Sequence, residues 1–141
     1  MSDIRNGKRL MVVPSAANVG LKSISLGLLR TLQREGVKVG FVKPIAPPMA
    51  AKGLFELSTH FAKTLCHVRV AGSIPYARAD ECAHNDEIPT LMEDVVSLVE
   101  TASEDHSIVV VEGLAYEADS PLAAQLNLEM AHCLEPPWWW F

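Results

Sequence analysis

The sequence predicts an α/β fold in which a small, mostly parallel β-sheet is flanked by helices. Three observations predict this class: short β-branched segments, apolar residues at helical spacing between them, and proline or glycine at the boundaries. The 141 residues suit one domain with a core of its own. Because the chain is 49% hydrophobic but 6% aromatic, we expect that core to be aliphatic. Strands that alternate with helices favour parallel pairing through helical crossovers.

The first strand is expected at 9–13, where Pro14 ends it because proline cannot continue a ladder. The helix that follows carries apolar residues at steps of three and four, which predicts one shared face: Leu21, Ile24, Leu28 and Leu32. Gly36 suits the end of that helix, and a second strand is expected at 38–42. Strand, helix and strand have the length of a βαβ unit, whose right-handed crossover makes the strands parallel.

The pattern weakens from 44 to 88, where short helices are expected near 54–65 and 79–84. A clear helical stripe returns at 88–102. It leads into 107–112, whose continuous β-branched run predicts a central strand covered on both faces. A last helix is expected to begin at Ser120 and Pro121 and to reach Leu134.

A further strand is expected after Leu134, but 135–141 hold two prolines, three tryptophans and a phenylalanine. Proline disfavours regular pairing there, and a sheet of about three strands is small for its class and leaves both edges open. We therefore interpret 1–134 as part of a domain and 135–141 as a Pro/Trp-rich tail outside its pattern.

The turn at 14–23 is the strongest local motif, because it follows a strand and opens a helix, as phosphate-binding loops do. The Walker pattern requires glycine, four residues, and then Gly-Lys-Ser/Thr. Here Ser15 replaces the first glycine and Leu21 replaces the lysine. Lysine and serine come one residue late, which rotates a helical side chain by about 100°. The alternatives are a weak nucleotide or phosphate site and a tight turn without nucleotide; the candidate residues are Asn18, Gly20, Lys22 and Ser23.

Two charged residues follow or end the predicted strands. Lys43 comes directly after the second strand, and Glu112 ends the third in a Val-Val-Val-Glu-Gly run like that of a Walker B strand. Open α/β sheets bind ligands at the carboxyl ends of their strands, so both side chains are expected at that edge, near Lys22. The plainer alternatives are that Lys43 and Glu112 are solvated, or that they pair with each other.

Composition and spacing exclude several function classes. The net charge of −5, without a Lys/Arg-rich run, argues against nucleic-acid binding. Apolar stretches fall short of the roughly 20 residues of a membrane span, and no export signal is recognised, so a cytoplasmic location is expected. The odd number of cysteines, three, fits a reducing compartment. Their spacing to histidines does not fit a metal site, and no Gly-x-Ser-x-Gly elbow exists, so no catalytic residue and no metal ligand are assigned.

Several ordered blocks together resemble the amino terminus of long-form bacterial phosphate acetyltransferases. The blocks lie at 11–14, 18–27, 40–46, 91–96, 109–114 and 126–131. The resemblance implies an incomplete three-layer P-loop-like fold over 1–134, similar to dethiobiotin synthetase. One departure is Ser15-Ala16-Ala17, where that family often has a Thr-Gly-Thr-like sequence.

The resemblance also implies a function. In that family the region is a regulatory or assembly module, and acetyl transfer between acetyl-CoA and phosphate belongs to a separate carboxy-terminal domain. The implied partner is therefore the rest of a phosphate acetyltransferase chain or its oligomer. No certain cofactor is implied beyond a degenerate nucleotide site. The alternative is a P-loop nucleotide-dependent enzyme or nucleotide-binding domain similar to dethiobiotin synthetase.

Overall fold

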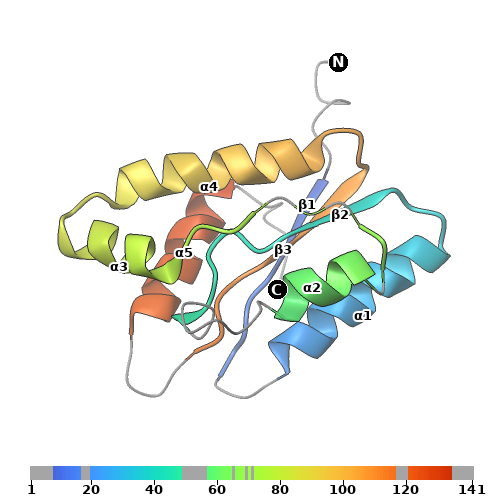
Figure 1. The fold of residues 1–141 in the computed structure, drawn as a ribbon, viewed down its shortest axis with the longest axis horizontal. Helices are drawn as coiled ribbons and strands as arrows, with labels where there is room; N and C mark the ends of the chain where they lie inside the picture. The colour runs from blue at the N-terminus through green and yellow to red at the C-terminus, as the bar shows by residue number, and fades with distance from the viewer. Residues whose placement is uncertain are drawn as a thin grey trace.

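The computed structural model describes residues 8–16, 20–48, 57–64, 66–68, 70, 72–116 and 121–134. Helices follow each of the three strands along this part of the chain, with three helices in a row between β2 and β3 (Figure 1). In order they are β1 (Lys8–Val12), α1 (Leu21–Arg34), β2 (Val39–Val42), α2 (Leu57–Thr64), α3 (Tyr76–His84), α4 (Ile88–Ser103), β3 (Ile108–Glu112) and α5 (Leu122–Leu134). The α/β class predicted from the sequence is confirmed. Asn18 and the tail at 135–141 lie outside the described residues.

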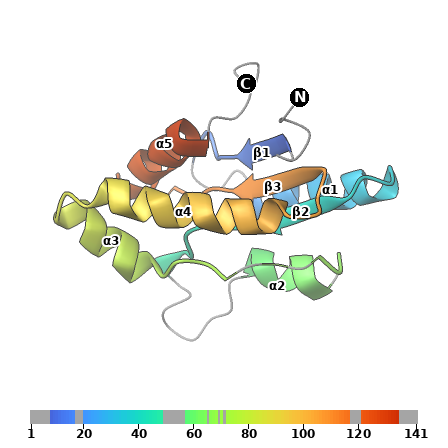
Figure 2. The same cartoon turned by 90° about the horizontal axis from the view of Figure 1, so that it is seen from above.

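The sheet has the strand order β1-β3-β2, and both pairings are parallel. Figure 2 shows β3 between its two neighbours. Val109, Val110 and Val111 of β3 are fully buried, which confirms the prediction of a central strand. The first βαβ unit therefore joins two strands that are not neighbours, because β3 occupies the position between them.

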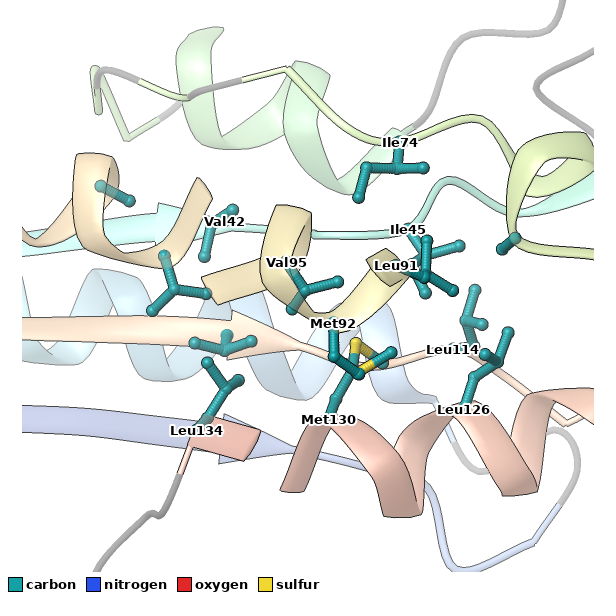
Figure 3. Close-up of a cluster of buried hydrophobic side chains, with 14 of the residues drawn as sticks. Val42, Ile45, Ile74, Leu91, Met92, Val95, Leu114, Leu126, Met130 and Leu134 are labelled. Carbon is teal, nitrogen blue, oxygen red and sulfur yellow. The ribbon is translucent and has the colours of Figure 1, made fainter. Parts of the chain in front are cut away.

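The two faces of the sheet are covered by different helices, which gives three layers. Val109 and Val111 pack with α4 and α5, whereas Val110 packs with α1 and α2. This division follows from the alternation of side chains along a strand. Figure 3 shows the larger cluster, in which Leu91 and Val95 of α4 and Leu126 and Met130 of α5 are among the buried residues. The core is aliphatic, as expected, although Phe41 is fully buried in the smaller cluster.

The buried face of α1 differs from the predicted one. Leu21, Ser25 and Leu29 are buried, whereas Ile24 is 58% exposed. These three residues form an i, i+4 row that lies against the sheet, and a row through Ile24 is rotated from it by about 100°. The helical period was therefore right but the predicted face was wrong at Ile24.

The outer edge of β2 is covered, so the expectation of two open edges was wrong on this side. Val70 and Ile74 form isolated parallel bridges with Phe41 and Ile45. The amide of Ala46 donates to the carbonyl of Ile74 at 2.9 Å. The amide of Ile74 in turn donates to the carbonyl of Pro44 at 2.8 Å. On the opposite side β1 is the edge strand of the sheet. None of the helices in the described ranges is both long and apolar enough to cross a membrane.

Candidate functional site

The carboxyl ends of the three parallel strands bring Lys43 and Glu112 to one edge of the sheet. Val12 is paired with Glu112, and Val42 with Val111, so β1 and β2 both end beside the end of β3. Lys43 is the next residue after β2. The prediction that these two side chains share an edge is confirmed in the geometry, and their use by a ligand stays a prediction.

Lys43 and Glu112 form an ion pair inside the protein. The ammonium Nζ of Lys43 lies 2.7 Å from Oε2 of Glu112 and also donates to the carbonyl oxygen of Gly113 at 2.8 Å. The two side chains are 5% and 1% exposed. An isolated charge at such a depth carries a large desolvation penalty, which only a partner with further hydrogen bonds offsets. Of the two plainer alternatives, pairing is therefore correct and solvation is wrong.

Hydrogen bonds to neighbouring elements fix the backbone on both sides of this pair. Ser73 donates its hydroxyl to the carbonyl of Lys43 at 2.5 Å. Asn127 of α5 accepts from the amide of Leu114 at 2.8 Å and donates to the Leu114 carbonyl at 2.9 Å. A Cβ at Gly113 would lie 2.7 Å from Oδ1 of Asn127, so only glycine allows this approach. Side chains from outside the strands thus bond to the backbone at this edge.

Sequence reasoning did not single out Asn127 or Ser73. Asn127 is 4% exposed within a helix that buries Ala123, Leu126 and Met130 on the same side. A polar residue inside an apolar helical stripe is the signal that identifies it, since a buried amide needs partners. Ser73 carries no comparable signal, because a serine next to a glycine in a loop is common.

Gly20 begins α1 in a left-handed conformation, but the Walker lysine position in that helix holds Leu21. Gly20 caps α1 with φ of 77°, and its carbonyl accepts the first helical bond from the amide of Ile24 at 3.1 Å. Leu21, in the position of the Walker lysine, is 8% exposed and packs inward. Lys22 and Ser23 lie on the exposed side of the first helical turn. The predicted site thus separates into a buried pair, Lys43 with Glu112, and a solvent-facing helix start.

The sequence matches the family model described as an AAA domain over residues 8–137. The chain belongs to the AAA domain family. Similar proteins include the phosphate acetyltransferase of Deinococcus radiodurans, 37% identical over 129 residues, which are 91% of this chain and 18% of the relative. The phosphate acetyltransferase of Pseudomonas putida is 35% identical over 124 residues, which are 88% of this chain and 18% of the relative. That of Escherichia coli is 29% identical over 126 residues, which are 89% of this chain and 18% of the relative.

The AAA domain therefore matches the N-terminal region of phosphate acetyltransferases, and the predicted resemblance is confirmed. The chain spans about 18% of the length of the relatives that it matches. The fold agrees with a P-loop-like domain: a small parallel sheet, helices on both faces, and a strand–turn–helix start.

The cysteines of the AAA domain differ in their surroundings. Cys66 and Cys82 are buried, whereas Cys133 is exposed; all three are free. Cys133 lies on the exposed side of α5. Partial burial raises the pKa of the Cys133 thiol, and the negative charge of Glu129 raises it further. Within the described residues, no group of three or more His, Cys, Asp or Glu side chains is arranged to hold a metal ion.

Proposed function

We propose that this chain is the N-terminal AAA domain of a phosphate acetyltransferase and acts as a regulatory or assembly module without the acyl-transfer active site. In the proposed full-length protein, acetyl-CoA and phosphate give acetyl phosphate and CoA, and the partner of the module is the rest of that chain or its oligomer. The names of the relatives support the family, and the pairing of Lys43 with Glu112 supports the absence of acyl transfer.

Acyl transfer to phosphate places strict demands on a site. Phosphate and CoA are both polyanions, and the attacked carbonyl develops negative charge, so the site requires unneutralised donors aimed at these groups. Here the buried ammonium Nζ of Lys43 is neutralised by Glu112 and donates to Gly113. The amide of Asn127 is likewise bonded to Leu114, and the chain as a whole carries a net charge of −5. These groups stabilise the fold instead of facing a substrate.

The test is an assay of acetyl phosphate formation by the purified 141-residue chain, supplied with acetyl-CoA and phosphate. We expect no product above the blank, while the Deinococcus radiodurans enzyme under the same conditions serves as the positive control. Acetyl phosphate formation that copurifies with the chain would refute the proposal.

A second candidate function is nucleotide binding of the dethiobiotin synthetase type. The observation that favours it is the left-handed conformation of Gly20, with φ of 77°, directly before α1. The proposed ligand-binding residues are Gly20, Lys22, Ser23, Lys43 and Glu112, together with Asn18, which lies outside the described residues. Calorimetric titration with Mg-ATP tests it: no heat at millimolar nucleotide removes the idea. Binding that survives both Lys22→Ala and Lys43→Ala would refute the residue assignment.

A further inference from the structure

The helices on the two faces of the sheet carry opposite charges. We propose that the exposed face of α1 in one copy of the chain docks into the groove between α4 and α5 of a second copy. The inference rests on the assembly role in the proposed function and deepens it, because it names the partner of the module and the two surfaces that meet.

The charges of the helices divide between the two outer layers. Within α1 and α2 there is no Asp or Glu, and four exposed residues are basic: Lys22, Arg30, Arg34 and Lys63. Within α4 and α5 there is no Lys or Arg, and four residues are acidic: Glu93, Asp94, Glu100 and Glu129. Figure 1 shows α1 and α4 on opposite sides of β3. The basic face of one copy therefore attracts the acidic face of another copy.

The groove between α4 and α5 combines apolar side chains with two carboxylates. It has a volume of about 590 Å³. Ile88, Met92 and Val96 of α4 line it, together with Glu93 of the same helix and Glu129 of α5. Neither carboxylate forms an ion pair among the described residues. A side chain with an apolar stem and a cationic end suits both parts of such a groove.

The exposed face of α1 supplies side chains of this kind. Arg30 and Arg34 lie one turn apart, about 6 Å along the helix axis, and neither forms an ion pair within the described ranges. Around the helix, Gly27 lies between these arginines and Ile24, which is 58% exposed. Nothing lies within 4 Å of a Cβ built on Gly27, so a partner can approach the helix closely there.

Helix α1 of one copy thus fits the groove of another as a third helix. The arginines are then directed to the two carboxylates, and Ile24 to the apolar residues of the groove. Because the two surfaces lie on opposite sides of the sheet, a copy that docks through α1 keeps its own groove free for the next copy. A contact of this heterologous kind builds open stacks, or rings where the rotation closes.

Sedimentation velocity of the 141-residue chain over a range of concentrations tests the docking. We expect self-association that weakens as NaCl is raised from about 0.1 to 0.5 M, because salt screens the facing charges. The variants Arg30→Glu/Arg34→Glu and Glu93→Lys/Glu129→Lys should each weaken it by at least about tenfold. The control Lys8→Glu/Lys38→Glu reverses two exposed lysines at the amino ends of the strands. It changes the net charge as much as the first variant does, and should alter the association by less than about twofold.

A mixture of the two reversed variants separates docking from a loss of folding. Neither variant should associate with itself, since both of its faces then carry the same sign of charge. In the mixture each contact again joins a basic face to an acidic one, so association should return. Failure to return while both variants keep the circular dichroism of the parent would overturn the proposal. A parent chain that stays monomeric up to about 1 mM, or association that both reversals leave unchanged, overturns it as well.

Amide shifts of the ¹⁵N-labelled parent chain locate the contact without any substitution. As the concentration rises, signals of Gly27 and Arg30 on α1 and of Glu93 and Val96 on α4 should move with one common dissociation constant. Shifts on one helix alone would indicate a two-fold dimer through that helix, and no shifts would leave the two faces to other proteins; both results overturn the proposal. Acetyl phosphate formation is assayed separately, so the docking can fail while the proposed function stands.

Discussion

The ammonium of Lys43 lies 2.7 Å from the carboxylate of Glu112, although the two residues are 69 positions apart and both side chains are almost fully buried. The pair sits at the carboxyl ends of neighbouring parallel strands, the edge at which open α/β sheets bind their ligands. The pair is buried with the core at this edge.

Removing one partner of this pair should be costly. Lys43→Met or Glu112→Gln leaves the other group buried without its counter-charge, and we expect each to lower the free energy of unfolding by about 3–5 kcal/mol. The double variant Lys43→Met/Glu112→Gln should cost clearly less than the sum of the single changes. Urea denaturation of the parent, the two single variants and the double variant gives the coupling energy between the two side chains. Single variants within about 1 kcal/mol of the parent would show that the pair is open to water in solution.

Asn127→Ala should loosen the segment after β3. Both backbone groups of Leu114 lose their side-chain partner in a buried setting, which predicts a loss of about 2–3 kcal/mol in the free energy of unfolding. Asn85→Ala, at an exposed asparagine after α3, is the control and should change stability by less than about 0.5 kcal/mol. Equal effects of the two substitutions in thermal and urea denaturation would contradict the role of Asn127.

Two glycine substitutions should have opposite signs. At Gly40 an added Cβ would lie 2.8 Å from the backbone oxygen of Ala102, which belongs to a packed helix and has little room to move. Gly40→Ala should therefore destabilise the protein by about 1–3 kcal/mol. At Gly27, within α1, nothing lies within 4 Å of the added atom. Gly27→Ala should stabilise by about 0.5–1 kcal/mol through helix propensity. A melting temperature of Gly40→Ala equal to or above that of the parent would contradict the packing of β2 against α4.

Cysteine labelling should be selective and should depend on pH. Cys133 is the exposed thiol, so a small alkylating reagent should modify it well before Cys66 or Cys82 in the native protein. Because its pKa is raised, the fraction of reactive thiolate at a given pH is smaller than for an ordinary cysteine, and the labelling rate should rise with pH. Glu129→Gln removes a negative charge, lowers this pKa and speeds labelling at fixed pH. Mass spectrometry of peptides from protein labelled at several pH values gives the labelling rate of each cysteine. Labelling of Cys66 faster than Cys133 would contradict the burial of Cys66 in its hydrophobic cluster.

The sequence was most informative where its pattern was longest. The unbroken β-branched run at 108–111 predicted a central strand, and the stripe at 88–102 predicted α4 within a residue or two. Because parallel strands end at one edge, Lys43 and Glu112 were expected to be close. Periodicity could not choose between the rows through Ser25 and Ile24 on α1, since the rows differ by one residue and the sheet decides which is buried.

Features that depend on single contacts were not predictable from the pattern. The bridges of Val70 and Ile74 with β2 involve isolated residues in a loop, which carry no repeat. The hydrogen bonds of Asn127 depend on the packing of α5 at the end of β3, which the helix sequence alone does not define. Both features arise from tertiary contacts between segments far apart in the chain.

The measurement that tests the central claim most directly is the NMR signal of the Lys43 ammonium in chain labelled with ¹⁵N-lysine. The signal is followed while Mg-ATP, phosphate and acetyl-CoA are added in turn, and Lys43→Met assigns it. If Lys43 is committed to Glu112 and Gly113, its signal should stay unchanged at millimolar concentrations of each ligand. A saturable shift with any of them would show that the pair opens for a substrate, and would contradict the account of this edge as a closed part of the core.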